Sequence, residues 1–313
     1  MLDNLIVSLG AVVPLFVLVG IGLVVKQMAF LTSEELRRVN KMVFEIFFFF
    51  MMFYNIYITD IGNLFRPGLV TFAIASVLLT ILIATFIVVR IEPTNARRGT
   101  MIQAIFRSNF VLVGIPVVSN LFPAEEIAVT TMMIAVIVPL YNVCGVLVLE
   151  TFRGGKINPW HMMKSVLQNP MILGAVLGAF LRLAALHIPL QILKPIGQVA
   201  AATTPVALII LGASFQLGTT EAHRPQLIET ILARLVLVPC AVLGSAYALG
   251  FSGIELATLM VIFAAPCAVA SFAMAQQMGG DADLAGNAVV FTSGLSAVTL
   301  FLWVLLFKTI GAF

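Results

Sequence analysis

Ten apolar segments of about twenty residues each fill most of this chain. A helix of about 20 apolar residues is long enough to cross the hydrocarbon core of a bilayer. Since 61% of the 313 residues are hydrophobic and only 10% are charged, a soluble fold of this length cannot bury so much apolar surface. We therefore predict an all-α integral membrane protein with ten transmembrane helices and short connections. The predicted spans are residues 5–25, 39–57, 67–90, 99–120, 126–149, 165–186, 195–217, 225–250, 254–278 and 284–308.

The distribution of Lys and Arg predicts the orientation of the chain. Eleven of these residues follow the first, third, fifth, seventh or ninth span, whereas four lie on the opposite side and two lie inside spans. Because positively charged connections stay in the cytoplasm, both termini are expected outside it. Charge that gathers at span ends also argues against a nucleic-acid partner. The first segment has no basic flank or A-x-A cleavage site, so we expect a span rather than a cleaved signal peptide.

The two halves of the chain match one another at an offset of about 158 residues. Three pairs of positions share this offset, and five spans per copy is an odd number, so the second copy must insert upside down. We therefore predict two inverted five-helix repeats, residues 1–157 and 158–313. The paired positions are Arg66-Pro67 with Arg224-Pro225, Ser108-Asn109 with Pro266-Cys267, and Glu125 with Asp283.

The fourth and ninth spans each carry residues that break a helix near the middle of the bilayer. Pro266 lacks an amide donor and pushes Ala265 out of helical geometry. Asn109 is a strong N-cap residue, and Gly114 and Pro116 weaken the helix that follows it. Irregular backbone inside a membrane survives only where it is buried in protein or lines a cavity. A pair of such breaks at matching positions predicts the binding site of a transporter.

The inner helix ends at these breaks would present unpaired amides and positive dipole ends to the cavity, which suits a carboxylate. Arg107 would add a full positive charge if it turns inward. Other interpretations stay open at this point. Asn109 can hydrogen-bond a neighbouring helix, Pro266 can be an ordinary kink, and Arg107 can extend to the interface or pair with an acid. For Arg234 we expect a structural salt bridge or hydrogen bonds to carbonyl groups.

Several other features have simpler interpretations. Thr32 to Glu35 matches a capping box that begins the second span. Gly174 and Gly178 permit close helix approach. Glu45 is a possible carrier of a coupling proton, although extension to the cytoplasmic face is the competing explanation. The remaining expectations are a second kink facing the cavity at Thr203-Thr204-Pro205, and a lipid-facing or helix-packing surface at Phe47–Phe50 and Met51-Met52.

These motifs resemble the auxin efflux carrier family, which includes bacterial organic-acid permeases and the plant PIN exporters. The resemblance rests on Ser108-Asn109 with Gly114-Ile115-Pro116, and on Ala265-Pro266-Cys267 continuing to Phe272–Gln276. It implies a scaffold of spans 1, 2, 6 and 7, a moving transport domain of spans 3–5 and 8–10, elevator-type motion and a homodimer through the scaffold. It also implies a bacterial inner (plasma) membrane location. The candidate substrate-binding residues are Arg107, Ser108, Asn109, Phe110, Ala265, Pro266, Cys267 and Ser271, with Asn109 matching the crossover asparagine that contacts a carboxylate.

Three departures from the family pattern bear on the substrate. Ser108 stands where the plant members have proline before the crossover asparagine, and Phe48-Phe49 stands where many relatives have Leu-Pro. A long central cytoplasmic loop is also missing. These differences favour a small mono- or dicarboxylate, such as malonate or malate, over an auxin-like acid.

We therefore expect a secondary transporter of a small organic anion, with a sodium-coupled symporter of the related bile-acid type as the alternative. An intramembrane enzyme fits poorly, because His161, His187 and His223 lie in loops and no H-E-x-x-H, G-x-S-x-G or P-loop motif occurs. All three cysteines lie in apolar runs, so no disulfide is indicated, and they are Cys144, Cys240 and Cys267. No metal site or cofactor is predicted. Because no Asp or Glu lies at the midplane, the coupling ion is left open.

Overall fold

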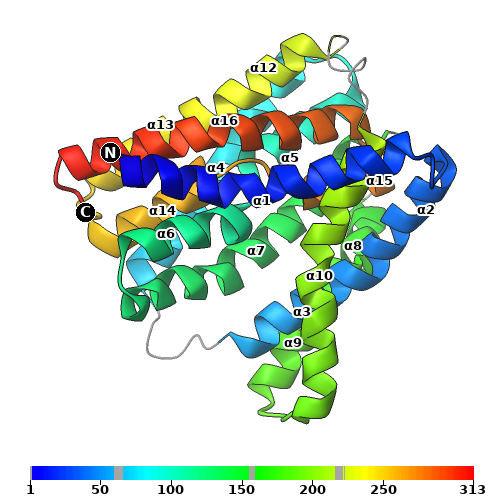
Figure 1. Cartoon of the computed structure of the whole chain (residues 1–313), viewed down its shortest axis with the longest axis horizontal. Helices are drawn as coiled ribbons and strands as arrows, with labels where there is room; N and C mark the ends of the chain where they lie inside the picture. The colour runs from blue at the N-terminus through cyan, green and yellow to red at the C-terminus, as the bar shows by residue number, and fades with distance from the viewer. Residues whose placement is uncertain (1, 60–65, 155–158, 216–220, 222) are drawn as a thin grey trace.

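The chain folds into a bundle of helices in the computed structural model, which describes residues 2–59, 66–154, 159–215, 221 and 223–313. No β-strand occurs in these ranges. Both chain ends lie at the same end of the bundle, as Figure 1 shows. The helices are α1 (Leu2–Gln27), α2 (Ser33–Met42), η1 (Val43–Phe47), α3 (Phe48–Ile58), α4 (Pro67–Ile91), α5 (Asn95–Phe106), η2 (Phe110–Gly114), α6 (Ile115–Leu121), α7 (Ala124–Phe152), α8 (Pro159–Gln168), α9 (Pro170–Leu183), α10 (Leu190–Ser214), α12 (Arg224–Leu232), η3 (Ala233–Leu237), α13 (Val238–Ala248), α14 (Gly253–Ala264), α15 (Ala270–Met278) and α16 (Ala282–Thr309).

Helical segments lie at the predicted positions, and many of them are long and apolar enough to span a membrane. Within the described ranges, six continuous helices meet that standard, and a bent pair raises the total to seven. Three further apolar helices are shorter, namely Val12–Gln27, Phe110–Leu121 and Gly253–Ala264. An all-helical membrane protein is therefore confirmed, whereas ten crossings in two inverted repeats remain a prediction. The predicted repeat boundary at 157/158 lies outside the described residues.

The sixth predicted span, residues 165–186, differs from the helices observed there. Helices α8 and α9 meet at an angle of 61°. Asn169 caps α9, since its side chain accepts a hydrogen bond from the Met171 amide at 3.0 Å, and Pro170 occupies the first turn. Proline tolerates that position because its missing amide has no partner in the helix there. The apolar helix therefore begins at Pro170, and the residues before it belong to a separate, differently directed helix.

Helices α3, α9 and α10 pack together and extend from one side of the bundle (Figure 1). The predicted close approach at Gly174 and Gly178 is confirmed. A Cβ atom at Gly174 would come 2.2 Å from the carbonyl oxygen of Phe49, and one at Gly178 would come 2.6 Å from that of Phe53. Only glycine permits such contact between helix backbones. Helix α1 packs along α10 and also against α16, so it lies between this group and the rest of the bundle.

The predicted capping box at the start of α2 is also confirmed. The hydroxyl of Thr32 accepts a hydrogen bond from the Glu35 amide at 3.3 Å, and the Glu35 carboxylate accepts one from the Thr32 amide at 2.8 Å. From this cap the chain runs without a break through α2, η1 and α3 to Ile58. This continuous helix carries one wall of the cavity described below.

The second packed group contains α4 to α7 and α12 to α16. Its core is apolar, with buried polar pairs between helices. The hydroxyls of Thr130 on α7 and Thr258 on α14 lie 2.7 Å apart and are fully buried. Buried polar groups require such partners because an unsatisfied hydroxyl is costly away from water. This group positions the two interrupted helices of the candidate site.

Candidate functional site

Two helices are interrupted at the positions that the sequence predicts. Helix α5 ends at Phe106 and helical structure resumes at Phe110, while α14 ends at Ala264 and α15 begins at Ala270. Ala265, directly before Pro266, is extended, with φ −66° and ψ 154°. This conformation is the one that a following proline favours. The interruptions are therefore confirmed, and proline chemistry explains the second one.

The two interruptions contact each other directly. Ser108 and Cys267 form an isolated antiparallel bridge. The Asn109 amide donates to the Pro266 carbonyl at 2.8 Å, and the Ala268 amide donates to the Arg107 carbonyl at 3.1 Å. These bonds satisfy backbone groups that a break inside a membrane would otherwise leave without partners. Each interruption therefore stabilises the other, which neither could achieve alone.

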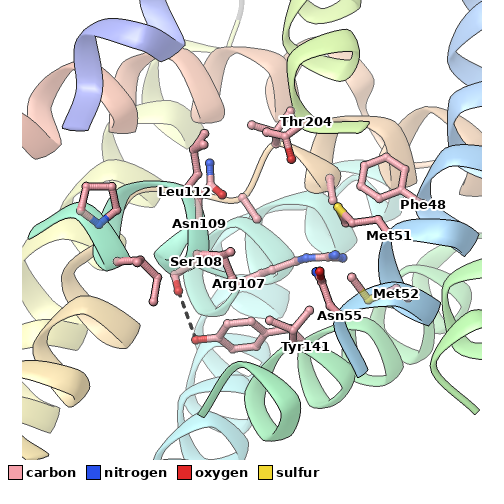
Figure 2. Close-up of a pocket in the computed structure, with 17 residues that line it drawn as sticks. Phe48, Met51, Met52, Asn55, Arg107, Ser108, Asn109, Leu112, Tyr141 and Thr204 are labelled. Atoms are coloured by element: carbon pink, nitrogen blue, oxygen red, sulfur yellow. Dashed lines mark hydrogen bonds between the residues drawn. The ribbon is translucent and has the colours of Figure 1, made fainter. Parts of the chain in front are cut away.

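A cavity of about 380 Å³ lies beside this crossing. Most of its wall is apolar, and the polar groups are concentrated near the crossing (Figure 2). Its size falls within the range of small-molecule sites, which are largely apolar with a few placed polar groups. The lining residues are Phe48, Met51, Met52, Asn55, Arg107, Ser108, Asn109, Val111, Leu112, Ile115, Pro116, Val138, Tyr141, Thr204, Ala268, Val269 and Ala270.

Arg107 provides a positive charge at the cavity wall. Its side chain extends toward Met51, Met52 and Asn55 in Figure 2, and it is 3% exposed. The guanidinium donates hydrogen bonds to Asn142 Oδ1 and to the Met274 sulfur. Among the residues that the structure describes, no carboxylate lies within salt-bridge distance of it. Of the two sequence-based alternatives, extension to the interface and pairing with an acid, neither is observed.

Asn109 occupies the N-cap position of η2, but its side chain does not cap the helix. Its amide nitrogen Nδ2 is buried and has no hydrogen-bond partner among the described residues. Asn109 lines the cavity, so this unpaired donor lies beside the space where a ligand would bind. The first turns after both breaks also line the cavity, through Val111 and Leu112 on one side and Val269 and Ala270 on the other. Amides in the first turn of a helix have no partner within that helix.

Tyr141 adds a hydroxyl to the wall beside the crossing and was not among the residues predicted from the sequence. Its hydroxyl lies 3.4 Å from the hydroxyl of Ser108 and 3.4 Å from the carbonyl oxygen of Ile262 (Figure 2). The residue is 2% exposed and lies on α7, the helix that follows the first crossing. A tyrosine within an otherwise apolar segment was the available signal, because a buried hydroxyl needs partners.

The predicted site residues occupy two layers at the crossing. Arg107, Ser108 and Asn109 line the cavity, as does Pro116. The others lie behind the lining, among protein groups, and their roles in binding remain predictions. Gly114 has a steric role, since a Cβ there would come 2.7 Å from Val261. The residues behind the lining are Phe110, Gly114, Ala265, Pro266, Cys267 and Ser271.

Several further residues test the sequence interpretation. Thr204 lines the cavity, as expected, and α10 runs as one helix through this segment, so the kink expected there stays a prediction. Phe48, Met51 and Met52 also line it, and Phe48 and Met52 are buried in the core, so part of the expected helix-packing surface also forms the cavity wall. The helix turns them inward because α3 is held against α9 and α10. Glu45 is exposed, pairs with Lys41 at 3.7 Å and is not part of the lining.

Arg234 is the second buried cation of the crossing and lies on η3. Its guanidinium donates four hydrogen bonds of 2.9 to 3.2 Å, all to backbone carbonyl groups. Of the two alternatives considered from the sequence, the structure therefore shows hydrogen bonds to carbonyls. The acceptors are Ile105 and Phe106 at the end of α5, Ile262 near the end of α14, and Ala265 directly after α14.

Comparison with known proteins agrees with this architecture. A family model described as membrane transport protein matches residues 7–159 and residues 155–304. A curated relative from Methanothermobacter thermautotrophicus (strain Delta H), described as an uncharacterized transporter, is 23% identical over 302 residues. The match covers 95% of this chain and 97% of the relative. Since the family model covers nearly the whole chain, this protein belongs to the membrane transport protein family, that of the auxin efflux carriers.

Proposed function

We propose that this protein is a secondary transporter that binds a small organic anion in the cavity beside the two interrupted helices. One observation carries the proposal. The buried guanidinium of Arg107 lies at the cavity wall and has no carboxylate partner among the described residues. A buried cation is costly unless it is paired, so a bound anion would supply the missing charge. The free amide of Asn109 and the first amides of η2 and α15 offer further donors to the same anion.

The lining favours a monocarboxylate with an apolar body over a dicarboxylate. Arg107 is the one charged residue in the lining, and it lies close to Asn109 and Ser108. Much of the remaining wall is apolar, including Phe48 and Leu112. A second ionised carboxylate would face that surface without a counter-charge, which is unfavourable in a low dielectric. The apolar wall would instead contact a hydrocarbon portion of the substrate.

Alternating access would involve movement between the α3–α9–α10 group and the group that holds the crossing. Among the described residues, side-chain hydrogen bonds join the continuous α2–η1–α3 helix to the group that holds the crossing. The Asn40 amide donates to Gln276 Oε1 at 2.7 Å, and the Asn142 amide donates to the Met52 sulfur at 2.8 Å. Asn142 also accepts from Arg107, so it links the proposed anion site to α3. An elevator-type displacement would break both contacts while leaving the crossing intact.

The first test measures stabilisation by ligands in detergent. A ligand that binds only the folded protein stabilises it by about 2.7 kcal/mol at a concentration of 100 Kd. A panel of mono- and dicarboxylates is compared on wild type, on Asn109→Ala and on Arg107→Gln. Asn120→Ala is the matched control, because Asn120 is exposed and hydrogen-bonds its own helix through the Pro116 carbonyl.

The proposal expects at least one carboxylate to raise the apparent Tm of wild type and Asn120→Ala, with the effect lost or strongly reduced in Asn109→Ala and Arg107→Gln. Uptake of that acid into proteoliposomes should likewise be retained in wild type and Asn120→Ala and be lost or strongly reduced in Asn109→Ala and Arg107→Gln. If the two cavity variants bind and transport as wild type does, the site assignment is wrong. If dicarboxylates alone stabilise wild type, the inference from the apolar wall is wrong.

The remaining expectations extend this proposal. Both termini would lie outside the cytoplasm, in keeping with the charge bias and with their position at one end of the bundle (Figure 1). The protein would lie in a bacterial inner membrane and dimerise through the scaffold. Cysteine labelling from each side of the membrane tests the first statement, and cross-linking in native membranes tests the last.

A further inference from the structure

Arg234 occupies an uncommon position for a buried cation. The residue is fully buried within a π-helical turn at the middle of the α12–η3–α13 helix. Its guanidinium contacts four carbonyl oxygens and, among the described residues, no carboxylate lies within salt-bridge distance. The charge is therefore balanced by backbone dipoles rather than by an acid. Single π-helical turns of this kind are often found at functional positions.

The four carbonyls come from the ends of both interrupted helices. Ile105 and Phe106 belong to the last turn of α5, while Ile262 and Ala265 belong to the end of α14. The last carbonyls of a helix have no partner within it and carry the negative end of its dipole. Two such ends meeting in an apolar interior produce a site for a cation. Arg234 fills that site.

The opposite side of the crossing has the opposite polarity. There the first turns of η2 and α15 line the cavity with the positive ends of helices, beside Arg107. In secondary transporters built from interrupted helices, the amide ends face an anionic substrate group, and the carbonyl ends together with unwound carbonyls coordinate the coupling Na⁺. The carbonyl side is therefore where a coupling cation would be expected.

We propose that the guanidinium of Arg234 is a resident cation that takes the place of a coupling sodium ion, so that this protein works without sodium. The inference rests on the proposed transport function for its mechanistic meaning. The assignment of Arg234 as the cation at the four carbonyl groups does not depend on the identity of the substrate. An arginine stays charged at all physiological pH values and cannot dissociate from the carbonyl groups during a transport cycle. The four carbonyl groups therefore keep a hydrogen-bond donor in every state of the cycle. Sodium ions then have no binding site through which a sodium gradient could drive transport.

The experiment compares the apparent Tm of detergent-solubilised protein in NaCl, KCl and choline chloride at equal ionic strength, without substrate. Wild type is expected to show the same Tm in all three salts. Arg234→Ala removes the cation and its four hydrogen bonds to carbonyl oxygens, of which that of Ile262 keeps the Tyr141 hydroxyl at 3.4 Å, so its Tm should fall and should rise again with Na⁺ or with guanidinium. Arg234→Lys keeps the charge and should remain insensitive to sodium. Leu235→Ala is the control, since Leu235 is a neighbouring buried residue without charge.

Two results would overturn the inference. One is a sodium-dependent rise in the Tm of wild type, or uptake by wild type that requires a sodium gradient. The other is a folded Arg234→Ala protein whose Tm responds to neither Na⁺ nor guanidinium. If Arg234→Ala does not fold, the behaviour of wild type in the three salts decides. The Tm measurements need no substrate, so failure of every carboxylate to bind would refute the proposed function and leave the Tm test valid.

In uptake assays, Arg234→Lys should lose about tenfold or more in transport relative to wild type, the scale of one charge-assisted hydrogen bond. Lysine has a shorter side chain and three donors, so it cannot reach all four carbonyl groups. The cation response of Arg234→Ala distinguishes a replaced cation from a purely structural contact, because loss of packing alone, as in Leu235→Ala, gives no cation response.

Discussion

The contact between α9 and α3 permits a quantitative test of the packing. Gly174 faces the backbone of Phe49 so closely that a Cβ atom would lie 2.2 Å from the carbonyl oxygen, 3.0 Å from the carbonyl carbon and 3.2 Å from Cα. The shortest ordinary van der Waals contact is 3.4 Å. The atoms to be displaced belong to helix backbone, so no side-chain rotation relieves the overlap. Gly174→Ala must therefore separate the two helices by about 1 Å, the difference between 3.4 and 2.2 Å.

Such a separation affects the whole interface rather than one atom pair. A gap of about 0.5 to 1 Å removes a quarter to a half of the dispersion energy of each contact. Overpacked sites cost about 1 to 3 kcal/mol, while alanine in place of glycine within a helix gains about 1 kcal/mol. We expect a net loss of about 1 kcal/mol for Gly174→Ala, and of up to about 2 kcal/mol if the backbone cannot relax.

Gly244→Ala is the matched control, because Gly244 is also helical and a Cβ there would meet nothing within 4 Å. This substitution should stabilise the protein by up to about 1 kcal/mol through helix propensity alone. Both variants are measured by apparent Tm in the same detergent, at one heating rate, since unfolding of membrane proteins is often irreversible. Equal shifts for the two variants, or a stabilised Gly174→Ala, would refute the close contact between α9 and α3.

Three other predictions concern stability and use the same Tm assay. Thr32→Ala removes the cap of α2 and should cost about 1 kcal/mol. Thr258→Val should cost about 1 to 3 kcal/mol because it leaves the Thr130 hydroxyl buried without this partner, and the Thr130→Val/Thr258→Val double variant should lose less than the sum of the single changes. At Glu92, directly after α4, burial by itself raises the pKa of the carboxyl group. Hydrogen bonds to the carboxylate, first from the Thr94 amide, together lower the pKa by more than burial raises it, so the pKa lies below its usual value. The resulting stability is present above the ordinary glutamate pKa and is lost as pH falls through the lowered one, so acid should reduce the Tm of wild type more than that of Glu92→Gln.

The positions of both interruptions could be predicted from local chemistry. Proline has no amide hydrogen, and it restricts the residue before it wherever it stands. Ala265 is extended for that reason. Polar residues such as Asn109 inside an apolar segment indicate a cavity or a partner, since lipid offers none. The cap at Thr32 and the close approach at Gly174 depend on similarly local rules and were also predicted correctly.

The composition of the cavity wall was harder to predict. Phe48 and Met51 form part of it although their segment has the composition of a lipid-facing surface. Which face of an apolar helix points inward depends on its neighbours, because lipid and protein interiors are almost equally apolar. Tyr141 was missed for the same reason, as its hydroxyl finds partners on two other segments of the chain.

Taken alone, the sequence determined that this chain is helical, that lipid surrounds it, and that two of its helices are interrupted. Each of these properties follows from residues close together in the chain, through hydrophobicity, backbone donors and side-chain caps. Only the tertiary structure decided that the interruptions bond to each other at Asn109 and Pro266, and that Arg234 joins the carbonyl ends of both helices. These contacts join residues that are far apart in the chain, 31 positions between 234 and 265 and 157 positions between 109 and 266. No local preference determines which distant group will hydrogen-bond to a backbone group that has no partner in its own helix.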